Sequence, residues 1–258
     1  MYVETRGSGP PLVLVHGWAM HGGIFAPLVD ALAQVRTLKL VDLPGHGRSH
    51  DERFELESCA KALLDRIGAA DWLGWSLGGL VALEAARLDP QRVRSLVLVA
   101  VNPRFVSSSR WEHGVPHEVF AQFGADLAKD YNRTVDRFLA LECIGSDCAR
   151  DELRTLQRQV HEHGRASREA LESGLHALDG CDMRASLPTL SMPALWIAGA
   201  RDRLVPWQAL EWAAQQMPHG RFARIAGGGH APFIGHPDRV LAELLPFLDG
   251  GVNEALAS

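Results

Sequence analysis

The sequence has few cysteines and no long apolar run. None of its 4 cysteines belongs to a CxxC pair or a dense disulfide framework; they are Cys59, Cys143, Cys148 and Cys181. This spacing indicates reduced thiols and excludes the common zinc-binding motifs. No window approaches the roughly 18 uninterrupted apolar residues of a membrane-spanning helix. Because the segment Met1–Gly7 also lacks the basic start and apolar stretch of a secretory signal, we expect a cytoplasmic protein with no metal, no cofactor and no membrane contact.

Positive charge is not in excess either. The chain has 26 Lys and Arg against 31 Asp and Glu, a net charge of −5. A general nucleic-acid binder needs a broad basic surface, so this class is excluded, although a local basic patch stays open. The content of hydrophobic residues is 47% and that of charged residues 22%, which excludes wholesale disorder. A length of 258 residues suits one large domain, or a core domain with an insertion.

Short apolar segments alternate with helical patterns along most of the chain. Strands are predicted at 12–15, 38–41, 72–75, 95–100, 194–198 and, more weakly, 221–226. Helical spacing lies between them, at 25–32, 57–67, 77–88, 208–215 and 238–248. Segments that are apolar on both faces are typical of parallel strands covered by helices. The alternation therefore predicts an α/β fold with a mostly parallel sheet and helices on both faces.

The alternation stops in the middle of the chain. Between about Ser107 and Leu187 the sequence is polar, has helical spacing at 119–141 and 147–160, and offers no convincing strand. An insertion of this size within an α/β core is typical of a helical cap. We expect a core formed by residues 1–108 and 185–258, with a cap at 109–184.

A G-x-S-x-G motif follows the third predicted strand. It runs from Gly74 through Ser76 to Gly78 and leads into a predicted helix. A nucleophilic serine must protrude from a sharp turn, and glycine on either side relieves the crowding there. The amides at the start of the following helix favour negative charge near the serine. The short motif alone is weak, but this strand–turn–helix context predicts that Ser76 is a nucleophile.

A serine nucleophile needs a base, and one of the 12 histidines is well placed. His230 follows three glycines, after the last predicted strand and before the last helix. Imidazole titrates near neutral pH and can accept and return a proton. Asp202, just after the strand at 194–198, can orient that imidazole, although an ion pair with Arg201 or Arg203 is an alternative for it. The chain order Ser76, Asp202, His230 is that of α/β hydrolases.

Two backbone amides must bind the oxyanion of such a reaction. One follows the nucleophile and belongs to Leu77; the other comes from the loop after an early strand, where Trp18 stands. The side chains of Trp18 and Trp75 either line the acyl pocket or belong to the core packing. The motifs so far specify a serine hydrolase and leave its substrate open.

Longer segments resemble a known family. HGW at 16–18, VDLPGHGRS at 41–49, WLGWSLGGLVA at 72–82 and GHAPFIGHP at 229–237 are typical of α/β hydrolases. Together with NRTVDRFLALE at 132–142, they resemble the pimeloyl-[acyl-carrier-protein] methyl ester carboxylesterases of biotin synthesis, from about Thr5 to Leu248. The tryptophans near the serine and the 132–142 segment point to this family. The chain departs from the family's pattern at Gly227 and Gly228, where the family has bulkier residues.

The resemblance implies the same roles for Ser76, Asp202 and His230, with oxyanion amides at Trp18 and Leu77. It implies that the substrate is bound by side chains around the acyl channel, namely Trp18, Trp75, Phe105, Phe138, Leu139, Ala140, Leu141 and Glu142. It also implies that cap arginines dock an acyl carrier protein carrying a pimeloyl methyl ester. The matching positions are Arg133, Arg137, Arg150 and Arg154.

The spacing of the cap arginines is compatible with two interpretations. Residues four apart share a helix face, so each pair can present two guanidinium groups to an acidic partner. Nearby aspartates can instead pair with them as ordinary surface ion pairs. The leading hypothesis is a monomeric methyl esterase acting on pimeloyl-carrier protein. The alternatives are a general carboxylesterase without a protein partner, a carbon–carbon bond hydrolase, and a non-catalytic ligand-binding module.

Overall fold

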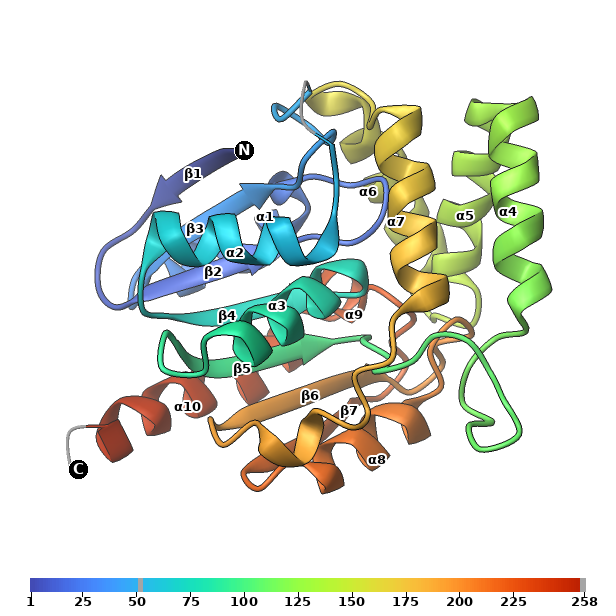
Figure 1. Ribbon diagram of the computed structural model, residues 1–258. Coiled ribbons are helices and arrows are strands. Elements are labelled where there is room, and N and C mark those ends of the chain that lie inside the picture. Colours follow the sequence, from blue (N-terminus) through green and yellow to red (C-terminus); the bar gives the residue numbers. More distant parts are fainter. Residues whose placement is uncertain (51–52, 256–258) are drawn as a thin grey trace.

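The computed structural model describes residues 1–50 and 53–255 of the chain. Within them lies a seven-stranded sheet with strand order β1-β3-β2-β4-β5-β6-β7 (Figure 1). β1 is antiparallel to β3, and all other neighbouring strands are parallel. The strands are β1 (Tyr2–Arg6), β2 (Pro11–Val15), β3 (Thr37–Asp42), β4 (Ala70–Trp75), β5 (Val93–Val99), β6 (Ala194–Gly199) and β7 (Gly220–Ile225).

Helices cover both faces of the sheet. One face carries α1 (Ala26–Leu32) and α10 (Pro237–Ala255), which contact each other; the other carries α2 (Leu56–Ile67), α3 (Leu77–Leu88) and α8 (Trp207–Gln216). Crossover connections between parallel strands are right-handed, so the direction of each connection across the sheet decides which face its helix covers. The connection from β2 to β3, which contains α1, runs in the opposite direction from the later connections. Short helical turns complete the core: η1 (Gly22–Phe25), η2 (Leu187–Thr189) and α9 (Pro232–Gly235).

The sheet is buried on both sides. Every residue of β4 and of β6 is buried, and Trp72 and Trp196 are fully enclosed although tryptophan is large. Because both faces are covered, these strands have no polar face, which is why they read as continuous apolar runs in the sequence. The expected α/β-hydrolase fold is confirmed. The pattern missed β1, an edge strand with no fully buried residue and few apolar ones.

Four helices stand together beside the sheet (Figure 1). They are α4 (His117–Lys129), α5 (Tyr131–Cys143), α6 (Ala149–Glu162) and α7 (Arg168–Gly180), and they come between β5 and β6 in the chain. The predicted single helix at 119–141 is two helices. The side chain of Asp130 accepts a hydrogen bond from the Arg133 amide at 3.1 Å and so caps the N-terminus of the second helix, α5. The sequence pattern also missed α7. The core and cap boundaries at 108/109 and 184/185 stay a prediction.

Candidate active site

Ser76 lies at the turn between β4 and α3. Its backbone is in the left-handed region, with φ of 52°, a strained conformation for a residue with a side chain. A Cβ on Gly74 would lie 2.4 Å from the Gly78 carbonyl oxygen, and one on Gly78 would lie 2.1 Å from the Val15 carbonyl oxygen. Only glycine therefore fits on either side of this serine, as the motif requires.

The structure brings Ser76, His230 and Asp202 together. His230 Nε2 lies 2.9 Å from Ser76 Oγ, and His230 Nδ1 lies 2.8 Å from Asp202 Oδ2. The other carboxylate oxygen of Asp202 accepts the amides of Leu204 and Val205 at 2.8 and 3.0 Å. Because Asp202 accepts a hydrogen bond from the protonated Nδ1, the other ring nitrogen, Nε2, is unprotonated. It can therefore accept a hydrogen bond from the Ser76 hydroxyl.

The three side chains of this site are buried away from water. Ser76 is 3% exposed, and the side chains of His230 and Asp202 are each 1% exposed. Burial by itself lowers the pKa of His230, but the charge and hydrogen bond of Asp202 outweigh it, so the pKa of His230 is raised. Within the described residues Asp202 forms no ion pair with Arg201 or Arg203. A serine, a base and an orienting acid are thus in position for proton transfer.

The two amides expected to bind the oxyanion are those of Leu77 and Trp18. Leu77 is the first residue of α3, and the first-turn amides of a helix have no acceptor within the helix. In the described part of the chain the Trp18 amide donates no hydrogen bond to another backbone group. A Cβ on Gly17 would sit 3.3 Å from Ser76 Cβ, so the loop that carries Trp18 lies against the serine turn. Both amides are therefore available to an oxyanion formed at Ser76.

His16 supports this oxyanion loop and was missed by the sequence reasoning. Its Nδ1 lies 2.7 Å from the Gly17 carbonyl oxygen, and its Nε2 accepts the amide of Leu43 at 2.9 Å. Complete burial and, to a smaller extent, the neighbouring His46 together lower the pKa of His16 to about 3. A neutral imidazole thus joins the loops after β2 and β3. Its place directly after the strand at 12–15 was the signal in the sequence.

Two tryptophans near Ser76 hold different parts of the site. Trp18 Nε1 donates to the Leu171 carbonyl oxygen on α7 at 2.8 Å, and its ring packs edge-on against Phe138, 4.7 Å between centroids. Trp75 Nε1 donates to the His230 carbonyl oxygen at 2.9 Å. Trp18 thus joins the core to the cap. Trp75 holds the backbone of His230, and its expected role in lining the acyl pocket stays a prediction.

The segment 138–142 does not present one continuous face. It belongs to α5, where Phe138, Leu139 and Glu142 are buried, Leu141 is half-buried and Ala140 is exposed. Successive residues of a helix point about 100° apart, so five in a row cannot all line one channel. The structure therefore places Ala140 on the outer surface, unlike the expectation. Phe105 is buried in the segment after β5, where its carbonyl accepts the amide of Val115.

The cap arginines are exposed and partly paired. Arg137 Nη1 forms an ion pair with Asp126 Oδ2 at 2.9 Å, and Arg154 pairs with Asp151 at 3.3 Å. Arg133 joins Arg137 in lining a groove of about 470 Å³ between α4 and α5. Arg150 lies at the start of α6. Exposed pairs of this kind contribute little to stability, so the guanidinium groups can exchange partners at small cost.

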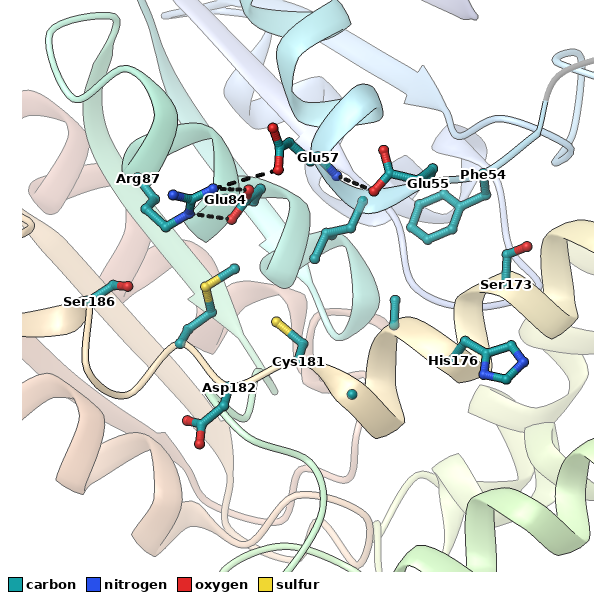
Figure 2. Close-up of a pocket in the computed structure, with 14 residues that line it drawn as sticks. Phe54, Glu55, Glu57, Glu84, Arg87, Ser173, His176, Cys181, Asp182 and Ser186 are labelled. Carbon is teal, nitrogen blue, oxygen red and sulfur yellow. Dashed lines mark hydrogen bonds and ion pairs between the residues drawn. The ribbon is translucent and has the colours of Figure 1, made fainter.

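Other cavities and clusters lie away from Ser76. A cavity of about 570 Å³ between α7 and the helices α2 and α3 is lined by Glu84, Arg87 and Cys181 among others, and by no residue of the Ser76 site (Figure 2). Within the described residues one group of side chains has metal-ligand spacing, formed by Asp147, Cys148 and His236. Asp147 and His236 already pair with each other at 2.9 Å.

Comparison with known proteins places the fold. A family profile described as alpha/beta hydrolase fold matches residues 10–237. An esterase from Exiguobacterium antarcticum superposes with a TM-score of 0.86 at 21% identity, covering 96% of this chain and 95% of that one. A bromoperoxidase from Bacillus anthracis does so with a TM-score of 0.86 at 23% identity and the same coverage. At such identity these structures share the fold alone.

Closer relatives decide the family. A pimeloyl-[acyl-carrier protein] methyl ester esterase from Xanthomonas campestris pv. campestris is 52% identical over 250 residues, covering 96% of this chain and 98% of the relative. One from Stenotrophomonas maltophilia is 49% identical, covering 97% and 100%. The chain belongs to this α/β-hydrolase family. In this member of the pimeloyl-[acyl-carrier protein] methyl ester esterase family, no helix in the described range is long and apolar enough to cross a membrane.

Proposed function

We propose that this chain hydrolyses the methyl ester of pimeloyl-[acyl-carrier protein], releasing methanol. The observation that carries the proposal is the continuous chain of contacts from Ser76 through His230 to Asp202. Relatives at 52% identity over nearly the full length are named for this reaction. The geometry supports an ester hydrolase, and the relatives support the choice of ester.

The reaction follows from the roles of the three side chains. His230 takes the proton of the Ser76 hydroxyl as its oxygen attacks the ester carbonyl, and the amides of Trp18 and Leu77 stabilise the oxyanion. His230 then gives the proton to the departing methoxide, and methanol leaves an acyl-enzyme at Ser76. Water, deprotonated by His230, attacks this ester, and the carboxylate product leaves as Ser76 regains its proton.

Substrate entry requires the cap to move. Ser76 and Trp18 are almost wholly buried, and the hydrogen bond from Trp18 to Leu171 holds α7 against the oxyanion loop. A Cβ on Gly174 of α7 would lie 2.8 Å from the Trp18 ring, so the helix is in direct contact with the site. An acyl chain can therefore reach Ser76 when α7 withdraws from Trp18. A carrier protein docked on the cap is positioned to insert its acyl arm as this contact opens.

Docking on the cap also explains how the thioester is spared. The acyl group is attached to the carrier through a thioester at one end and carries the methyl ester at the other. A docked carrier protein fixes the length of arm that enters the enzyme. The distal ester then reaches Ser76, while the proximal thioester stays outside the reach of the oxyanion amides.

The cap arginines give the test. We expect the double variant Arg133→Glu/Arg137→Glu to lose about 10- to 100-fold in kcat/KM on the carrier-linked ester, because it reverses charge on a surface facing an acidic partner. Hydrolysis of p-nitrophenyl acetate, which needs no docking, should stay within about twofold of the wild type. Arg221→Ala, on the exposed edge strand β7, is the matched control. Equal losses on both esters would instead favour a general carboxylesterase.

Labelling by a fluorophosphonate separates an enzyme from a binding module. A reactive Ser76 is labelled in the wild type and not in Ser76→Ala. Absence of labelling in the folded wild type would favour a non-catalytic module. A cytoplasmic location and a monomeric state stay predictions, the second measurable by light scattering of the purified chain.

A further inference from the structure

The loop that carries His230 is held by both the core and the cap. From the core, Trp75 Nε1 donates to the His230 carbonyl oxygen at 2.9 Å. From the cap, the carbonyl oxygen of Glu142, near the end of α5, accepts the His230 amide at 3.1 Å. Both backbone polar groups of His230 are therefore occupied, one by each part of the molecule. A shift of the end of α5 would change the position of the imidazole.

The glycines of this loop allow the cap to lie directly against it. A Cβ on Gly229 would lie 3.1 Å from the Glu142 carbonyl oxygen and 3.1 Å from Ser146 Cβ. A Cβ on Gly227 would lie 2.1 Å from Asp147 Oδ2, and the Asp147 amide donates to the Gly227 carbonyl oxygen at 3.1 Å. The φ of +80° favours glycine at Gly227, and the close approach of the cap leaves little space for a side chain at Gly229.

The side chain of Glu142 is sealed in this contact. The residue is 1% exposed, and neither carboxyl oxygen has a hydrogen-bond partner among the described residues. The groups that face it are His230 and Asp202 from the core loops, Glu152 from α6 and Cys143 beside it on α5. An ionised carboxylate without a partner is very unfavourable in such surroundings.

The protonation of these groups follows from their surroundings. Burial raises the pKa of Glu142 to about 8; the charge of His230 opposes this, and the charges of Asp202 and Glu152 add to it. Burial also raises the pKa of Glu152, and it raises the pKa of the Cys143 thiol to about 12. At neutral pH Glu142 is therefore an uncharged acid beside the Ser76 site.

We propose that uncharged Glu142 is a positioning residue for His230, holding the end of α5 on the histidine loop. Ionisation leaves a carboxylate that has no partner and is repelled by Asp202. Water then enters the contact, the end of α5 withdraws, and the His230 amide loses its acceptor on the cap side. The imidazole is held less well toward Ser76. This inference rests on the proposed function, because it assumes that His230 is the base.

The test is the pH dependence of fluorophosphonate labelling at Ser76, which reports the Ser76–His230 pair without binding of an acyl chain. In the wild type, the labelling rate should rise as His230 loses its proton and then fall at least about threefold by about pH 9.5, with an apparent pKa near 8. Glu142→Gln keeps the uncharged shape and should lose this alkaline decrease. Glu169→Gln, on the exposed surface of α7, is the matched control and should keep it.

The same alkaline decrease in Glu142→Gln and wild type would overturn the inference. Should Glu142→Gln fail to fold, Glu142→Met removes the charge with a side chain of similar length.

Thermal unfolding gives a second measure of the protonation of Glu142. Glu142 ionises near pH 4.5 in the unfolded chain and only near pH 8 in the folded one. The free energy of unfolding of the wild type should therefore fall relative to that of the variant as pH rises between these values. A pH-independent difference in Tm would contradict a buried neutral Glu142.

Two controls separate this inference from the proposed function. Ser76→Ala must not be labelled, which shows that the probe reports the expected serine. If the folded wild type is not labelled at any pH, the proposed function fails and the inference, which assumes that His230 is the base, fails with it. If labelling is normal but Glu142→Gln behaves as the wild type, the proposed function stands and the inference fails.

Discussion

At the scale of the residue, His230 is governed by two opposing effects. Burial favours the neutral imidazole, and the carboxylate of Asp202 favours the protonated one; the second prevails and the pKa of His230 is raised. A base must be neutral to accept the Ser76 proton. The acidic limb of the rate profile should therefore lie above the ordinary histidine value of 6.5.

Asp202→Asn removes one of these effects and leaves the other. Burial then acts on His230 without the opposing charge of Asp202, so the pKa of His230 should fall and the acidic limb of kcat/KM should move to lower pH. The amide can also hold the imidazole in the wrong tautomer, so kcat should fall by about 10³- to 10⁴-fold. Hydrolysis of p-nitrophenyl acetate from pH 5 to 9 measures both effects. Asp30→Asn, on the exposed surface of α1, should change neither, and an unmoved limb in Asp202→Asn would contradict the assignment.

At the scale of the element, the β4–Ser76–α3 unit is built on close backbone contact. The start of α3 lies against the end of β2, where the Gly78 position faces the carbonyl oxygens of Val15 and His16. This contact fixes the Leu77 amide relative to the loop that carries Trp18. The relative position of these two segments thus depends on elements packed without side chains between them.

Gly78→Ala should break this contact. The added Cβ would lie 2.1 and 2.5 Å from two carbonyl oxygens, so the helix must shift. We expect a loss of at least about 2 kcal/mol in the free energy of unfolding, with activity lost in the protein that still folds. Gly124→Ala in α4 is the matched control: nothing lies within 4 Å of its Cβ, and alanine should stabilise the helix by about 0.5–1 kcal/mol. Equal effects in urea unfolding would contradict this account.

At the scale of the whole molecule, the fold encloses neutral histidines next to the sheet. Burial lowers the pKa of His16 to about 3 and that of His46 to about 4, while the unfolded chain titrates near 6.5. The unfolded state therefore binds more protons between these values, and the folded state loses stability as pH falls from 6.5 toward 3. Above pH 6.5 this contribution is complete.

A variant of His46 tests this pH dependence. Each such histidine contributes a slope of at most about 1.4 kcal/mol per pH unit in this range. His46→Gln should therefore reduce the slope of unfolding free energy between pH 6.5 and 4, compared with the wild type. His219→Gln, which removes an exposed histidine, should leave the slope unchanged. Urea unfolding at several pH values measures it, and an unchanged slope in His46→Gln would show that His46 is not held neutral.

The sheet and the sharp turn at Ser76 were predictable from local pattern. Buried parallel strands are apolar on both faces, and the serine turn requires glycine at fixed positions, so Gly74, Ser76 and Gly78 stand out in the sequence. β1 was missed because an edge strand needs few apolar residues. The separate helices α4 and α5 were merged, since Asp130 ends one helical pattern and starts the next without a glycine or proline.

The sequence by itself determined the α/β-hydrolase fold and the sharp turn at Ser76, because the first depends on local periodicity and the second on required glycines. Only the tertiary structure decided that Trp75 supports His230, that Ala140 faces solvent, and that Glu142 is sealed without a partner. These properties depend on which distant segments exclude water from a side chain. Burial of that kind arises from packing between elements, and no local pattern specifies it.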